Sequence, residues 1–243
     1  MGSETIMKRV SLMLAALLLF GSLQLVYAQG GLDRAESEFQ ETAHLMQMAI
    51  EDNEKDLYTD TMNYDTYKVA LNSAMHQLSD SEKLVHINVS FGSLDRGLKY
   101  INDHFGHLNG GPCIQDFAML LKEVFPSEDG WVVCHRGGSG FLVFSVGDFT
   151  QDDILDYYNV LKARWHDTPY VTANGNGTVE GMALLYLAVL GPDCGENFQS
   201  LRNQLVYKKL ALRDVTNCGY VIQTAPDHYI SSVEIDEAAY MED

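Results

Sequence analysis

The sequence predicts an α/β sandwich of the ferredoxin-like type, in which helices flank a mostly antiparallel sheet. Helix-period and strand-period segments alternate along most of the chain, in the order α-β-α-β-β-α-β-α-β. Hydrophobic residues make up 46% of the sequence, which is typical of a globular protein. A glycine-rich segment, Gly137 to Gly140, separates two apolar strand-like runs, which indicates a β-hairpin.

The beginning of the chain predicts a membrane anchor. Lys8 and Arg9 precede an uncharged, Leu-rich stretch from Val10 to Ala28. As a helix this stretch is roughly 28 Å long, close to the roughly 30 Å of a bilayer core. We therefore expect residues 1–31 to form a hydrophobic anchor. A cleaved signal peptide is the alternative, because Val26-Tyr-Ala28 has the small residues of a cleavage site.

Residues 32–54 predict a helical stalk. Small or apolar residues recur there at steps of three and four: Leu32, Ala35, Phe39, Thr42, Met46 and Ala49. Such a seam fits the pairing of two helices from two subunits. It also fits one amphipathic helix folded back on its own domain.

The folded domain is expected over residues 55–226, followed by an acidic tail over 227–243. A helix over 63–77 has an apolar face, and residues 84–91 alternate as a strand. A turn at Asn102 follows. The remaining elements are a helix over 114–124, a hairpin over 131–146, a helix that Thr150 begins, a strand over 182–190, a last helix over 198–212 and a closing strand over 220–222.

The segment from Leu98 to Phe141 resembles the GGDEF domain of diguanylate cyclases. Leu98-Lys-Tyr-Ile-Asn-Asp-His-Phe-Gly-His107 is similar to the family pattern Asp-x-Asp-x-Phe-Lys-x-x-Asn-Asp-x-x-Gly-His-x-x-Gly-Asp. His135-Arg-Gly-Gly-Ser-Gly-Phe141 is similar to Arg-x-Gly-Gly-Asp/Glu-Glu-Phe. Residues 56–65 and 201–209 resemble the family's opening signature and closing helix. The resemblance implies a GGDEF/nucleotide-cyclase-like sandwich, preceded here by the hydrophobic helix and the stalk.

The carboxylates that the family uses for catalysis are missing. The resemblance implies two that hold a divalent metal against GTP, one eight residues before the guanine-binding Asn and one in the hairpin tip. Here the first position is Leu94, or Ser93 if one residue bulges, and the tip has Ser139 and Gly140. A second guanine-binding acid is replaced by Gly111. We interpret the domain as one without cyclase activity, without catalytic residues and without a metal site.

The residues of the family pattern that this chain still has predict a degenerate nucleotide-binding site. The resemblance assigns to it Lys99, Asn102, Gly137, Gly138, Ser139, Gly140 and Lys209. Asn102 would meet the guanine edge and Lys99 a phosphate. The alternative is that these residues persist for folding, since two glycines allow the positive φ of a tight turn. No cofactor is expected, and Mg²⁺ only if GTP binding is retained.

The charge balance limits the partners. The chain has 34 Asp and Glu against 16 Lys and Arg, a net charge of −18, which repels nucleic acid. We expect a non-catalytic GGDEF-type signalling domain on a membrane protein, acting in dimerisation or relay as a homodimer or with a partner signalling protein. GTP or cyclic di-GMP is its candidate ligand. A divergent active diguanylate cyclase and an exported interaction protein without nucleotide are the alternatives.

The family resemblance and the positive-inside rule place the domain on opposite sides of the membrane. The family's need for GTP places the domain in the cytoplasm, held at the membrane by one N-terminal span. The positive-inside rule, applied to Lys8 and Arg9, would instead place the domain outside. Cleavage after Ala28 would leave it secreted or periplasmic.

Overall fold

The computed structural model describes residues 55–77, 82–93, 95–191, 196–225, 228–236 and 238–240. The predicted anchor over 1–31 and the predicted stalk over 32–54 lie outside these ranges. Within them, no helix has the length and apolar character needed to cross a membrane.

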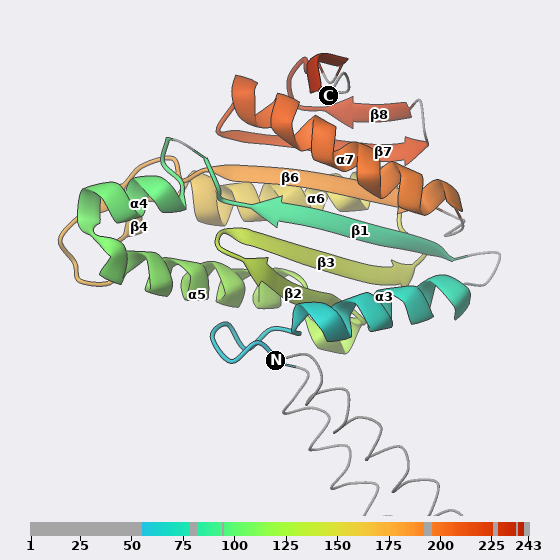
Figure 1. Cartoon of the computed structure of the whole chain (residues 1–243), viewed down its shortest axis with the longest axis horizontal. Coiled ribbons are helices and arrows are strands. Elements are labelled where there is room, and N and C mark those ends of the chain that lie inside the picture. The colour runs from blue at the N-terminus through green and yellow to red at the C-terminus, as the bar shows by residue number, and fades with distance from the viewer. Residues whose placement is uncertain are drawn as a thin grey trace, which may run out of the picture. The chain divides into compact units, whose positions relative to one another are not determined.

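A six-stranded sheet with the order β2-β3-β1-β6-β7-β8 forms the centre of the domain (Figure 1). Its strands are β1 (Lys83–Ser90), β2 (Val132–Gly137), β3 (Gly140–Gly147), β6 (Leu184–Gly191), β7 (Cys218–Ala225) and β8 (His228–Ser231). The β6–β7 pair is parallel and the other neighbours are antiparallel. The predicted α/β sandwich with a mostly antiparallel sheet is therefore confirmed.

Helices cover both faces of this sheet. They are α3 (Tyr64–Gln77), α4 (Leu98–Phe105), α5 (His107–Val124), α6 (Gln151–Leu161) and α7 (Glu196–Val215). On β1, Val85, Ile87 and Val89 pack with α5 and α6, whereas Leu84 faces the cluster that contains residues of α3 and α7. The strand is therefore buried on both faces along most of its length.

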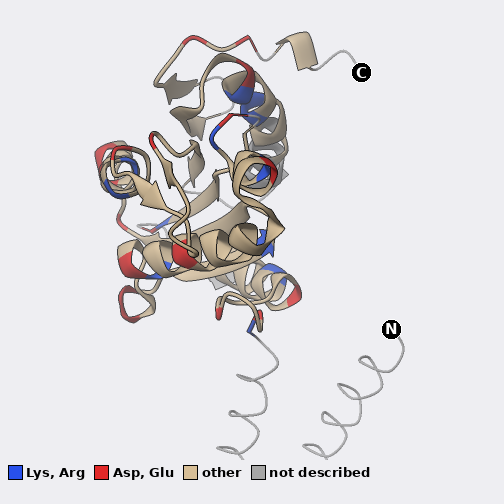
Figure 2. Cartoon of the chain, turned by 90° about the vertical axis from the view of Figure 1, so that its left-hand side faces the viewer, with Lys and Arg blue, Asp and Glu red and all other residues tan. Residues whose placement is uncertain are grey.

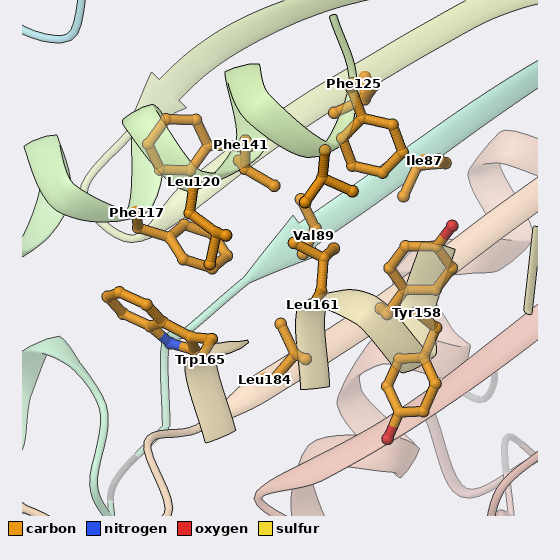
Figure 3. Packing of buried hydrophobic residues seen from close by; sticks show 14 of the residues in the cluster. Ile87, Val89, Phe117, Leu120, Phe125, Phe141, Tyr158, Leu161, Trp165 and Leu184 are labelled. Carbon is orange, nitrogen blue, oxygen red and sulfur yellow. The ribbon is translucent and has the colours of Figure 1, made fainter. Parts of the chain in front are cut away.

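Aromatic residues fix α5 against the end of β1. Phe91, Phe117 and Trp165 are all buried, and their ring centroids lie 4.6–5.3 Å apart. Figure 3 shows Phe117 and Trp165 beside each other within this core. Trp165 belongs to a π-helical turn, η2 (Lys162–His166), which follows α6 directly. Such ring pairs stabilise this end of the sheet beyond the apolar area that they bury.

The region around Asn102 differs from the prediction. The turn at Asn102 and the helix start at residue 114 were wrong, because α4 contains Asn102 and α5 begins at His107. Gly110, Gly111 and Pro112 lower the helix propensity of this stretch. In the structure a Cβ at Gly110 would clash with the side chain of Asn102, so glycine lets the two helices pack closely. Tertiary packing therefore outweighs local propensity here.

The sheet continues beyond residue 226. Residues 228–231, which the sequence assigns to the acidic tail, form β8 and pair with β7. A second, two-stranded sheet of β4 (Tyr170–Val171) and β5 (Thr178–Val179) was also not predicted. Strands of two to four residues are too short to show a period of two in a sequence.

The hairpin tip yields a stability prediction. Gly138 has φ +56°, and a Cβ there would meet no heavy atom within 4 Å, so a substitution would cause backbone strain without a clash. We expect Gly138→Val to lower the free energy of unfolding by about 1–2 kcal/mol. Gly138→Asn is the matched control, because Asn tolerates this region of φ better. Chemical unfolding of both variants measures the difference, and equal stabilities would contradict the assigned turn.

Candidate functional site

An open cavity of about 670 Å³ lies where the end of β1, the start of α4, the hairpin tip and α7 meet. Its volume is in the range of small-molecule sites. Of the residues assigned from the sequence, the structure brings together Lys99, Asn102, Gly138, Ser139 and Lys209 in the lining. Gly137 and Gly140 belong to the adjoining hairpin strands and lie outside the lining.

The end of β1 places Ser90 at the cavity. Ser90 pairs with Gly140 of the hairpin on one side and with Leu185 of β6 on the other. Residues 91–97 then connect β1 to α4, a longer connection than the family spacing implies. Counting back from Asn102 to Leu94 or Ser93 therefore misses the residue at the strand end. Leu94 lies outside the described residues, and the Ser93 hydroxyl donates to Asn217 Oδ1 at 2.5 Å.

Ser90 is a buried residue that sequence reasoning missed. Its side chain is 2% exposed, and its hydroxyl has no hydrogen-bond partner among the residues that the structure describes. A buried hydroxyl without a partner costs free energy, and here the residue that carries it lines the cavity. The signal in the sequence was the strand predicted over 84–91, which places Ser90 near the end of that strand.

Two contacts hold the hairpin tip beside the strand end. The Phe91 N–H donates to the Ser139 carbonyl at 3.3 Å. A Cβ at Gly92 would clash with the Ser139 hydroxyl, so glycine at 92 allows the tip to approach. The tip thus forms one wall of the cavity.

His135 joins the tip to the loop over residues 55–62. Its Nε2 lies 3.0 Å from the Gly138 carbonyl, and its Nδ1 lies 3.6 Å from Asp56 Oδ2. Burial acts to raise the pKa of Asp56, but hydrogen bonds from Thr59 and the charge of His135 outweigh it and lower the pKa overall. The loop before α3 is therefore linked to the wall of the cavity.

Basic residues give the cavity a local positive charge. Lys209 and Arg213 lie four residues apart on α7, hence on one face of the helix, and Lys99 comes from α4. Figure 2 views this end of the domain and shows basic segments in blue among acidic ones in red. Among the described residues that line the cavity, the one carboxylate is Asp103, which pairs with Lys99 at 2.5 Å.

Lys209 is the most enclosed of these cations. Burial lowers its pKa, and the nearby charges of Arg136 and Arg213 lower it further. Its Nζ lies 3.5 Å from Asn88 Oδ1, an uncharged acceptor. Arg213 was not assigned from the sequence, since it lies four residues after Lys209 but one residue beyond the helix predicted over 198–212.

The side of the cavity assigned to a base is altered. The Asn102 Oδ1 atom is buried against Gly110 and has no hydrogen-bond partner among the described residues. A Cβ at Gly111 would clash with the Tyr58 hydroxyl, so Tyr58 fills the space where the family pattern has its second acid. Within the described ranges, no three or more His, Cys, Asp or Glu side chains cluster as metal ligands would.

The sequence matches no model of a known protein family and no curated protein. The structure is similar to the GGDEF domain of TpbB (YfiN) from Pseudomonas aeruginosa, at 19% identity and a TM-score of 0.60, covering 78% of this chain and 99% of that one. It is similar to the diguanylate cyclase SiaD from Pseudomonas aeruginosa, solved with its activator SiaC, at 14% identity, TM-score 0.63 and coverage of 91% and 80%.

A third similar structure is the GGDEF domain of DgcB from Caulobacter crescentus, solved in complex with c-di-GMP. The identity is 14%, the TM-score is 0.57, and the alignment covers 70% of this chain and 95% of that one. These comparisons establish that the chain has the fold of a diguanylate cyclase-like GGDEF domain. The resemblance found in the sequence motifs is confirmed at the level of the fold.

The packing of α4 on α5 yields a second prediction. We expect Gly110→Ala to lower the free energy of unfolding by about 1–3 kcal/mol, because its Cβ would push against the buried Asn102 side chain. Gly111→Ala is the matched control: its Cβ meets the end of the half-exposed Tyr58, which can rotate away, and alanine favours the helix. Chemical unfolding compares the two. A Gly111 variant that is less stable than the Gly110 variant would contradict this packing.

Proposed function

We propose that this chain is a non-catalytic GGDEF-type signalling protein of the membrane, which acts in dimerisation or relay and retains binding of GTP or cyclic di-GMP. The observation that carries the proposal is the cavity at the end of β1. It keeps the cations Lys99, Lys209 and Arg213 but has hydroxyls, from Ser90 and Ser139, beside the strand end and in the tip.

The electrostatics of the cavity oppose turnover of GTP. Joining two GTP molecules requires a 3′-hydroxyl to attack an α-phosphate, and a metal ion held by carboxylates offsets the charge that develops. The Ser90 and Ser139 hydroxyls are weak ligands for Mg²⁺, which prefers carboxylates. Asp103, the carboxylate among the described lining residues, is engaged by Lys99. Binding can persist under these conditions while the chemical step loses its main source of stabilisation.

The link through His135 supports a role in relay. The loop over residues 55–62 directly follows the predicted stalk in the sequence, and His135 joins Asp56 of this loop to the Gly138 carbonyl at the cavity. A displacement of the loop would therefore act on the cavity wall through the side chain of His135. SiaD, which shares the fold, was solved with an activator protein, so a protein partner is compatible with this kind of domain.

The first test concerns catalysis. We expect the purified chain, given GTP with Mg²⁺ or Mn²⁺, to form no cyclic di-GMP by mass spectrometry, because the metal lacks carboxylate ligands at the cavity. The matched control is the double variant Lys209→Gln with Arg213→Gln, which removes the cations of the same cavity. Product that the parent forms and the double variant does not would overturn the non-catalytic proposal. Equal product from both would identify a contaminating cyclase.

The second test concerns dimerisation through the predicted stalk. Phe39 and Met46 are the largest residues of its seam, so Phe39→Asp with Met46→Asp should shift the full chain from dimer toward monomer. Gln40→Asp with Gln47→Asp adds the same charge off the seam and should leave the dimer intact. Sedimentation velocity at tens of micromolar, roughly the range of weak association, measures the difference. A parent chain that is monomeric throughout would remove the dimerisation proposal.

A further inference from the structure

We propose that the cavity at the end of β1 is a metal-free phosphate site. In this proposal Lys99, Lys209 and Arg213 bind the phosphates of a nucleotide or polyphosphate directly, without a divalent cation and with little selectivity for the base. The inference rests on the proposed function for the position of the ligand. It differs from that function in what the ligand must contain, namely a multiply charged phosphate chain.

The positive charge of Lys209 and Arg213 is poorly balanced by nearby acids. Lys209 is largely enclosed, and its one hydrogen-bond partner among the described residues is the uncharged Asn88 Oδ1. Arg213 faces the same cavity, and its ion pair with the adjacent Asp214 is long, at 3.6 Å. Burial lowers the pKa of Lys209, and the nearby charges of Arg136 and of the exposed Arg213 lower it further. An anion bound between Lys209 and Arg213 would offset this repulsion and pair with both side chains.

The hydroxyl groups at the cavity differ from carboxylates in how they interact with phosphate. A carboxylate accepts hydrogen bonds and repels phosphate, so a site with carboxylates needs a metal ion between the two anions. A hydroxyl can donate to a phosphate oxygen without a metal. The Ser90 hydroxyl is buried without a partner among the described residues, and the residue lines the same cavity as Ser139, Lys209 and Arg213. The strand end and the tip thus present donors where a metal-dependent site presents acceptors.

Magnesium should compete with the cations of this site for the phosphate oxygens. Mg²⁺ binds the same phosphate oxygens that Lys209 and Arg213 would contact, and it cancels part of the negative charge that attracts them. The described lining offers Mg²⁺ one carboxylate, Asp103, which is already paired with Lys99. Adding Mg²⁺ should therefore weaken binding of a phosphate chain, which is the opposite of its effect at a site with free carboxylates.

Recognition of the base should be weak at this site. Tyr58 occupies the space beside Gly111, and the Asn102 Oδ1 atom is turned against Gly110. Selectivity between bases depends on several well-placed hydrogen bonds to the base edge. One of the two polar contacts to the base is thus replaced by Tyr58, and the other, Asn102, is packed against α5. The phosphates then become the main determinant of affinity.

Calorimetry on the purified full chain tests the proposal with three probes: inorganic tripolyphosphate, GTP and ATP, each with EDTA and with millimolar Mg²⁺. We expect all three to bind in EDTA with affinities within about fivefold of one another. Mg²⁺ should weaken each by about threefold or more, and salt should weaken each through screening. Tripolyphosphate distinguishes a polyphosphate ligand from a nucleotide, because it has no base or ribose.

Variants link the signal to the cavity. Lys209→Gln and Arg213→Gln should each weaken tripolyphosphate binding by about tenfold. Lys68→Gln is the matched control: it removes the same charge from α3, outside the cavity lining, and should leave binding unchanged. Ser139→Asp should weaken binding in EDTA, and Mg²⁺ should then restore part of it, because the variant supplies a carboxylate to the metal.

The possible outcomes separate this inference from the proposed function. GTP binding that requires Mg²⁺, or that exceeds ATP binding by more than tenfold, would overturn the metal-free phosphate site and leave a nucleotide-binding domain. Equal effects of Lys68→Gln and Lys209→Gln would show non-specific attraction and also overturn it. Absence of binding by any probe would overturn both this inference and nucleotide retention, while the turnover assay would still decide whether the domain is non-catalytic.

Discussion

The contact between the end of β1 and the hairpin tip is the constraint on which the site depends. Ser90 pairs with Gly140, the Phe91 N–H bonds the Ser139 carbonyl, and Gly92 leaves room for the Ser139 side chain. β1 lies between β3 and β6 and is buried on both faces, so its end cannot move without disturbing the core. The wall of the cavity at this point is therefore tied to the core of the fold.

Most of the architecture could be predicted from the sequence because its elements are long and strongly patterned. The strand that ends at Ser90 and the hairpin around Gly138 were visible as apolar runs and glycines. The helices around Asn102 were not, because Gly110 and Gly111 are poor helix formers and lie in close contact with Asn102 and Tyr58. The contact with Tyr58 joins segments far apart in the chain, and no local pattern encodes it.

The site was predicted in part, for a related reason. Lys99, Asn102 and Ser139 could be assigned because they lie within recognisable motifs. Ser90 and Arg213 could not, because their roles depend on where β1 ends and on which face of α7 meets the cavity. Counting residues along a motif assumes a fixed connection, and the longer connection from residue 91 to residue 97 breaks that assumption.

The hairpin also shows how one substitution changes a link without removing it. The family pattern has an arginine where this chain has His135, and the imidazole still reaches two oxygens, at Asp56 and at the Gly138 carbonyl. A guanidinium has five donors, whereas an imidazole has two ring nitrogens, of which one lies at hydrogen-bond distance from the Gly138 carbonyl and the other 3.6 Å from Asp56. One ring therefore connects the loop that follows the predicted stalk to the wall of the cavity, tilted against Phe141 of the core. Because Phe141 is fully buried and pairs with Val89 on β1, this connection is anchored in the sheet.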